Sequence, residues 1–225
     1  MKNQQQGFTL IEIAIVLVII GLLLGGVLKG QELITSARVR NMISQQDGIK
    51  AAYFGFLDRY RALPGDYSTA TTNIKDTTAN GDGNGQITDG GTNKESILVW
   101  EHLSRAGFIN GSYTYNATQS DATTPKNPYA VYLQLIFDAA YGDSGTAQSK
   151  HNLKTGAQVP VEILAEVDRK IDDGNGLRGG FRFSQYQGNA ATAPAAAAAT
   201  GACINTTGDW QPTQSITNCG AASLF

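Results

Sequence analysis

Few side chains in this chain of 225 residues have the spacing that catalysis or tight metal binding needs. Its two histidines, His102 and His151, do not form HExxH or another metal-ligand spacing. The sequence has no phosphate-binding loop and no G-x-S-x-G motif. We therefore predict no catalytic residues and no enzyme activity.

One polar stretch has residue types that suit calcium. Asn80, Asp82, Asn84 and Asp89 lie in the run NGDGNGQITD, where oxygen-bearing side chains alternate and glycine stands at the sharp turn. Calcium prefers such hard oxygen ligands, and an aliphatic residue follows at the spacing of a calcium loop. The sequence therefore predicts a calcium site here, and calcium is the only cofactor it suggests.

The calcium pattern is incomplete, which leaves an alternative open. A calcium loop needs an acidic residue at its twelfth position, where this chain has Gly91. Asp89 or Glu95 would supply that ligand only if the loop took a different path. The alternative is a flexible turn cluster without a metal. A second acidic turn, Asp172-Asp-Gly-Asn-Gly176, is a weaker candidate of the same kind.

A single carboxylate, Glu12, lies in an otherwise uncharged apolar run from Phe8 to Leu28. As a helix, this run would span about 31 Å, close to the thickness of a bilayer core. It is longer than the apolar region of an ordinary signal peptide, and no A-x-A-like cleavage site follows it. A carboxylate in lipid costs several kcal/mol unless it is neutralised or paired. We therefore expect Glu12 to have a function, with snorkelling to the membrane surface as the alternative.

The run GFTLIE, Gly7 to Glu12, followed by an aliphatic stretch, resembles the processing motif of type IV prepilins and pseudopilins. The resemblance covers residues 1–60. It implies that a membrane peptidase cuts between Gly7 and Phe8 and that the new N-terminus at Phe8 is methylated. It also implies that Glu12 pairs with the Phe8 amine of an adjacent subunit, and such a polar pair would fix the register of two apolar helices.

The rest of the sequence predicts the elements that position these residues. Helical spacing of apolar residues continues to Ala62, and Pro64-Gly65 ends it. A helix from Phe8 to Ala62 would be about 80 Å long. Further along the chain, the patterns predict helices and strands, which are a helix over 95–109, a strand over 128–138, a helix opening at Pro160 and a strand over 178–186.

Together these features predict an α+β chain with a long N-terminal helical stem packed on a small antiparallel sheet, as in pilins. The expected divisions are a leader (1–7), a transmembrane and assembly half of the stem (8–28), a stem half that packs on the head (29–62), and a globular head (63–225). Cys203 and Cys219 close a loop near the end of the head. An even pair in a membrane-directed chain predicts one disulfide, with two reduced buried thiols as the alternative.

Composition and resemblance together indicate the partners. The net charge of −2 shows no basic face, so a nucleic-acid partner is not expected. The resemblance implies a prepilin peptidase, the inner-membrane assembly machinery, and copies of this chain and other pilins in a helical filament. It also implies an inner-membrane precursor and a filament at the cell surface, serving adhesion, motility or DNA uptake. The alternatives are a pseudopilin of type II secretion and a minor tip subunit that acts as a binding module.

Overall fold

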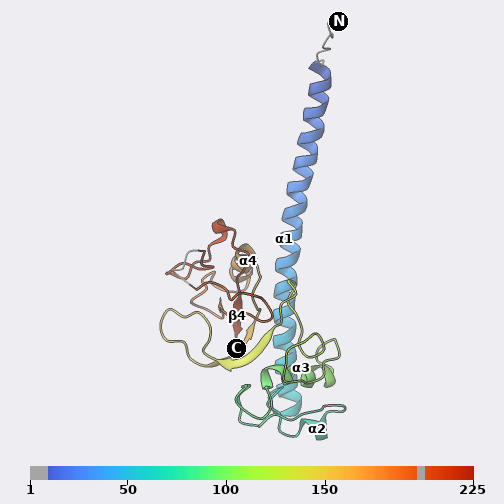
Figure 1. Cartoon of the computed structure of the whole chain (residues 1–225), viewed down its shortest axis with the longest axis vertical. Helices are drawn as coiled ribbons and strands as arrows, with labels where there is room; N and C mark the ends of the chain where they lie inside the picture. Colours follow the sequence, from blue (N-terminus) through green and yellow to red (C-terminus); the bar gives the residue numbers. More distant parts are fainter. Residues whose placement is uncertain (1–9, 197–200) are drawn as a thin grey trace. The chain divides into compact units, whose positions relative to one another are not determined.

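The computed structural model describes residues 10–196 and 201–225 (Figure 1). The chain divides into two compact units, Met1–Arg38 and Val39–Phe225. Helix α1, Leu10–Tyr60, is 51 residues long and has residues in both units. A four-stranded antiparallel sheet lies in the second unit. The predicted α+β architecture, a long N-terminal helix with a small antiparallel sheet, is confirmed.

Helix α1 ends close to the predicted position because the backbone leaves the right-handed helical conformation there. Arg61 adopts a left-handed conformation, with φ of 53°. Its N–H still donates to the Leu57 carbonyl at 2.9 Å, which satisfies one of the last free carbonyls of the helix. Pro64 follows, and a proline cannot continue a helix.

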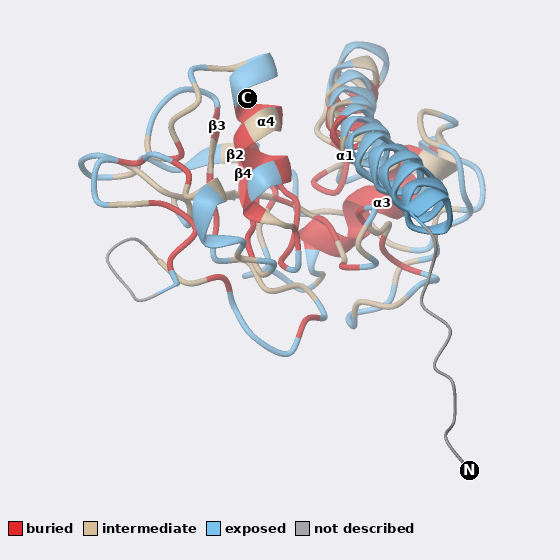
Figure 2. Cartoon of the chain, turned by 90° about the horizontal axis from the view of Figure 1, so that it is seen from above, coloured by how far each residue is buried: buried red, intermediate tan, exposed pale blue. Residues whose placement is uncertain are grey.

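The second unit begins where α1 acquires a buried face. From Val39 onward, buried residues recur every three or four positions, as one side of a helix requires. They are Val39, Met42, Gln46, Ile49, Ala52, Tyr53 and Phe56. Figure 2 shows the exposed residues along the N-terminal part of α1.

The sheet has the strand order β1-β2-β4-β3. Its strands are β1 (Gln134–Asp138), β2 (Lys150–Lys154), β3 (Phe181–Phe183) and β4 (Ala221–Leu224). Leu135 lies opposite Leu153, and Ser223 lies opposite both Leu153 and Phe181, so the register aligns buried residues across all four strands. The last of these strands in the sequence is therefore an interior strand of the sheet.

Two hydrophobic clusters use successive parts of the buried face of α1. Val39 and Met42 belong to one cluster with α4, Val161–Ile171, and with both cysteines. Residues from Ile49 to Phe56 belong to the other cluster with α3, Glu95–Arg105, which contributes Trp100. Residues 39–56 of α1 thus connect the part of the second unit that packs around α4 with the part that packs around α3.

The remaining elements match the sequence patterns in position but are shorter. The predicted helix over 95–109 is α3, and the predicted helix after Pro160 is α4. The predicted strands over 128–138 and 178–186 contain β1 and β3. Two short elements complete the described structure, which are α2 (Ala70–Asn73) and the 3₁₀ helix η1 (Pro212–Gln214).

Candidate functional site

The first candidate site is the N-terminal part of α1, residues 10–30, which we call the apolar part of α1. Its large side chains are exposed within the chain, with Leu10 at 92% and Leu22 at 75% exposure. Among the described residues, α1 is the helix whose length and apolar composition allow it to cross a membrane, with a mean hydropathy of 2.8 over its most apolar window. An apolar helix without a covering layer of its own chain has to be covered by lipid or by other helices.

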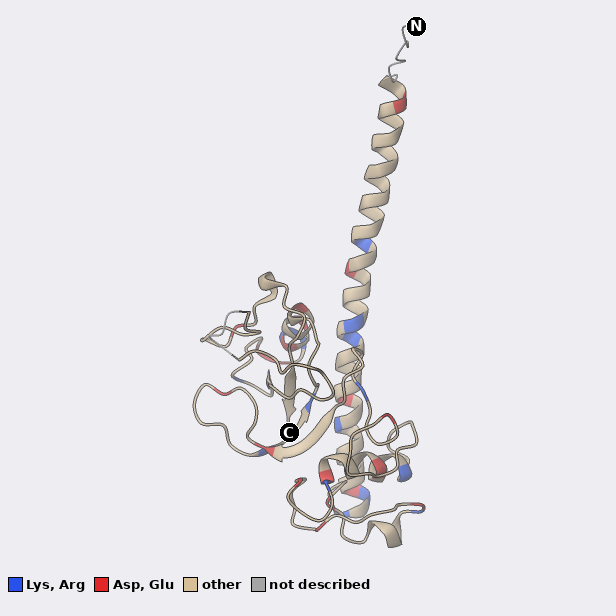
Figure 3. Ribbon diagram, viewed as in Figure 1, with Lys and Arg blue, Asp and Glu red and all other residues tan. Residues whose placement is uncertain are grey.

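Charge is confined to the two ends of this apolar part. Glu12 lies in the first turn of α1, where a carboxylate interacts favourably with the helix dipole. Figure 3 shows the uncharged stretch that follows it along the helix. The next charged residues are Lys29 and Glu32, whose side chains form an exposed ion pair with an Nζ–Oε2 distance of 2.6 Å.

Four glycines in this part of α1 have no packing explanation inside the chain. A Cβ atom placed on Gly21, Gly25, Gly26 or Gly30 would meet no atom within 4 Å in the described structure. Glycine in a helix interior costs about 1 kcal/mol relative to alanine. Space of this kind is what small residues give to closely packed helices in membranes. The predicted processing residues, Gly7 and Phe8, lie outside the described residues.

The second candidate site is a cluster of three carboxylates in the second unit. Asp66, Asp82 and Glu95 each bring one carboxylate oxygen within 4.8 Å of the others. Asp66 and Glu95 are 4% and 2% exposed, whereas Asp82 is open to solvent. Burial raises the pKa of both Asp66 and Glu95, because charged carboxylates lose hydration in the interior.

Backbone N–H groups surround this cluster and fix the loop over 80–88. The Asp66 carboxylate accepts hydrogen bonds from Asn84 N and Gly85 N, both at 2.9 Å. The Glu95 carboxylate accepts from Asp82 N and Thr88 N, also at 2.9 Å. The three carboxylates therefore organise the loop through its main chain, and their oxygens form a donor set of the kind that calcium prefers.

Of the four residues that the sequence predicts as calcium ligands, Asp82 belongs to this carboxylate cluster and the other three make separate contacts. Asp82 lies in the carboxylate cluster, and Asn84 donates its side-chain amide to Asp82 at 2.8 Å. Asn80 accepts from Thr71 N at 2.9 Å. Asp89 accepts from Ser96 N and Ser96 Oγ at 3.1 and 2.8 Å, and so caps the first turn of α3.

The sequence pattern offers Glu95 as a substitute ligand but gives no indication of Asp66. Asp66 lies in the run PGD, a few residues after α1 ends at Tyr60, and no feature of the sequence ties it to Asp82, which is 16 positions later. The calcium site remains a prediction, now with Asp66, Asp82 and Glu95 as its candidate ligands.

The second acidic turn also forms a cluster, made of Asp168, Asp172 and Asp173. Asp168 is fully buried at the end of α4, while Asp173 is exposed. Asp168 accepts from the Trp210 indole, and Asp172 accepts from Phe181 N at 2.7 Å. These carboxylates thus connect α4, β3 and the segment between the cysteines.

Cys203 and Cys219 form a disulfide with a Cα–Cα distance of 5.7 Å, which confirms the predicted pairing. Both cysteines are fully buried in the same cluster as α4 and Trp210. Val159 and Cys219 exchange backbone hydrogen bonds of 3.1 and 2.9 Å, so the closed loop is attached directly to the residues before α4.

The histidines have structural contacts. His102 is fully buried, accepts from Gly65 N through Nδ1 at 2.9 Å and contacts the Ala79 carbonyl through Nε2 at 3.1 Å. The two bonds assign the ring proton to Nε2. They also attach the backbone of Gly65 and Ala79 to α3. Burial lowers the His102 pKa, which favours this neutral form.

An exposed apolar N-terminal helix, an antiparallel sheet in the second unit and an acid in the first turn of the helix define a pilin-like subunit. Residues 2–28 match the family model for the prokaryotic N-terminal methylation motif. The chain therefore carries the signature of type IV prepilins and pseudopilins, whose members are structural proteins and not enzymes. No curated protein and no solved structure matches the chain.

Proposed function

We propose that this chain is a structural subunit of a type IV pilus, assembled through its N-terminal helix. The observation that carries the proposal is the apolar part of α1, which the described chain leaves uncovered. Lipid covers such a helix in the precursor, and sister helices cover it in a filament. The glycines from Gly21 to Gly30 leave room for close approach of those helices.

The proposed maturation follows the prepilin signature. A prepilin peptidase cuts between Gly7 and Phe8 and methylates the new amine, and the inner-membrane machinery then moves the subunit into the filament. In the filament, the Phe8 amine of one subunit pairs with the Glu12 carboxylate of its neighbour. A charge pair between two apolar helices has one favourable axial position, and this sets the register of assembly.

N-terminal mass spectrometry of the mature protein tests this proposal. The expected mature chain begins at a methylated Phe8 and retains the whole apolar segment. A mature chain that has lost residues 8–28 would show that the segment is a removable signal, and the proposal would then be wrong. Replacing Gly7 with a bulky residue is expected to block maturation and leave the precursor mass.

A pseudopilin of type II secretion is the second candidate. The size of the second unit and its disulfide favour a pilin. The acidic loops and the lack of a proline near Lys29 favour a pseudopilin. The abundance of this chain in sheared surface filaments separates these roles, because a major pilin is plentiful there. A minor tip subunit acting as a binding module would be present but scarce.

A further inference from the structure

The second unit contains a cavity that is far in sequence from the assembly helix. Its volume is about 390 Å³. Four segments line it, which are the residues that lead into α3, the loop over 117–119, the chain entering β1, and the loop over 186–189 that follows β3. A concave site built from several segments, with a few convergent polar groups, is the usual form of a small-molecule site.

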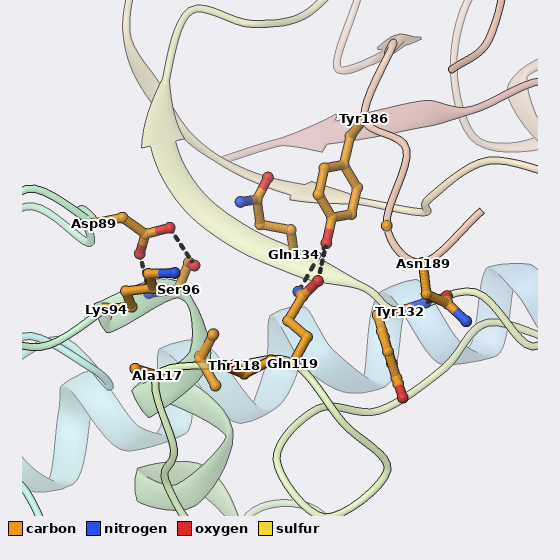
Figure 4. Close-up of a pocket in the computed structure, with 12 residues that line it drawn as sticks. Asp89, Lys94, Ser96, Ala117, Thr118, Gln119, Tyr132, Gln134, Tyr186 and Asn189 are labelled. Carbon is orange, nitrogen blue, oxygen red and sulfur yellow. Dashed lines mark hydrogen bonds between the residues drawn. The ribbon is translucent and has the colours of Figure 1, made fainter. Parts of the chain in front are cut away.

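Two tyrosines with fixed rings stand in this cavity. Tyr186 and Gln119 exchange hydrogen bonds, with the Gln119 amide donating at 2.8 Å and the Tyr186 hydroxyl donating at 3.1 Å. Tyr132 donates its hydroxyl to Asp121 at 2.7 Å. Figure 4 shows Tyr186 pointing toward Gln119, with Asp89 and Asn189 on opposite sides of the cavity. The rings are held before any ligand arrives, so binding costs little side-chain entropy.

The polar groups beside the rings retain hydrogen-bonding capacity. Within the described residues, the Gln134 side-chain amide makes no hydrogen bond and the Lys94 ammonium makes no ion pair. The Asn189 amide oxygen accepts from Tyr132 N at 3.0 Å. An amide both donates and accepts, so Gln134 can satisfy a hydroxyl group in either direction.

This combination excludes several ligand classes. A lipid chain would need a mainly aliphatic lining, and Ile97 and Ala117 are the main aliphatic contributors. A phosphate or another strong anion would meet a single ammonium, Lys94, and would be opposed by the Asp89 carboxylate. An uncharged ligand with an apolar face and many hydroxyl groups fits the amides, the tyrosine rings and the balanced charge.

We propose that this cavity binds a neutral carbohydrate, with the Tyr186 ring packing on the C–H face of a sugar and Gln134 hydrogen-bonding its hydroxyls. The polarised C–H groups of a sugar complement the negative face of an aromatic ring. The site is open and small, so the affinity of one cavity is weak. If the chain forms the proposed filament, the cavity repeats along it and the binding becomes multivalent.

The test uses the full chain, purified in a detergent without a sugar headgroup, because a glycoside detergent would compete. Binding is screened on immobilised neutral and sialylated glycans and then measured by calorimetry with a soluble neutral oligosaccharide. The expected result is binding to a neutral glycan in the millimolar range or tighter. Binding that is confined to sialylated glycans, or no binding at all, would overturn the proposal.

Matched variants locate the site. Gln134→Ala is expected to weaken binding at least fivefold without lowering the melting temperature, because the amide has no partner in the described chain. Tyr186→Phe keeps the ring and is expected to reduce affinity less than Gln134→Ala does. Gln86→Ala changes an exposed glutamine outside the cavity and is the control. Glycan binding unchanged in Gln134→Ala would place the glycan elsewhere and overturn the proposal. Because this test uses single subunits solubilised in detergent, its outcome is independent of whether the chain forms filaments.

Discussion

The Trp210 indole Nε1 donates a 2.6 Å hydrogen bond to Asp168 Oδ2, and the two residues are 6% and 0% exposed. This bond joins the loop closed by the disulfide to the end of α4. Because burial disfavours the charged carboxylate, the pKa of Asp168 rises to about 6. The Trp210 bond and a bond from Gly174 N act in the opposite direction.

The raised pKa of Asp168 predicts a specific pH dependence. An unfolded aspartate titrates near 3.8, so between about pH 4 and 6 the folded chain holds more protons at this site than the unfolded chain. Asp168 therefore contributes stability at low pH that is lost as the pH rises through about 6. A shift of this size corresponds to at most about 3 kcal/mol.

Asp168→Asn removes this titration and keeps an oxygen that accepts from Trp210. The free energy of unfolding of Asp168→Asn minus that of wild type is expected to increase as the pH rises from 4 to 7, because only wild type loses the Asp168 contribution. Urea denaturation of the full chain over this range measures it. Asp173→Asn in the same turn is exposed and serves as the control. A difference between Asp168→Asn and wild type that stays constant with pH would contradict the assignment.

Breaking the disulfide is expected to destabilise the second unit. The bond closes a loop with a sequence separation of 16, for which chain entropy predicts a loss of about 3 kcal/mol when it is opened. A reducing agent should lower the melting temperature of wild type and leave that of a Cys203→Ala/Cys219→Ala double variant unchanged. An equal effect on both proteins would mean that the reductant acts somewhere else.

Glu12→Ala tests the proposed pairing with Phe8. The variant is expected to be processed and inserted normally, because the cleavage site is intact, and to enter filaments poorly. Immunoblots of sheared filaments against total membrane protein measure this ratio. Glu32→Gln alters the exposed ion pair with Lys29, and such pairs contribute little, so it is the matched control. Wild-type filament yield from Glu12→Ala would refute the register mechanism.

Calcium titration tests the carboxylate cluster. Binding to Asp66, Asp82 and Glu95 would offset the repulsion and desolvation of these acids, so calcium is expected to raise the melting temperature and a chelator to reverse the rise. Glu95→Gln is expected to abolish the calcium response. Asp89→Asn, which keeps an oxygen to cap α3, is expected to retain it. Loss of the response in Asp89→Asn alone would favour the ligand set predicted from the sequence over the set that the structure brings together.

The elements that can be predicted from the sequence are those with a strong local pattern of residues. Helix α1 has an unbroken apolar run and a proline after its end, and α3 and α4 have apolar residues at helical spacing. Strands β2 and β4 were missed because neither alternates between apolar and polar residues. In β2, Asn152 and Lys154 are buried and both bond to Asp138 of β1, an arrangement that only the paired strands create.

The candidate sites divide in the same way, into local sequence patterns and groups that only the fold brings together. The methylation motif over residues 2–28 is a local pattern and can be recognised from the sequence, whereas the roles of Glu12 and of the cut after Gly7 stay predictions. The carboxylate cluster is tertiary, because Asp66 follows α1 and Glu95 begins α3. The spacing predicts Asp89 as a metal ligand, and that stays a prediction; in the structure its carboxylate accepts from Ser96 in the first turn of α3, a contact that depends on a turn whose path the sequence does not specify.

The position of β4 between β2 and β3 affects how this protein is made. Residues 221–224 are synthesised after the other three strands of the described sheet, yet they occupy its interior. A chain whose residues 221–224 have not yet been made or exported therefore cannot complete this sheet, and β3 lacks its partner strand in the described structure until these residues are present. A product truncated before Ala221 would keep the apolar part of α1 while lacking a finished sheet, so it would be a substrate for proteolytic quality control.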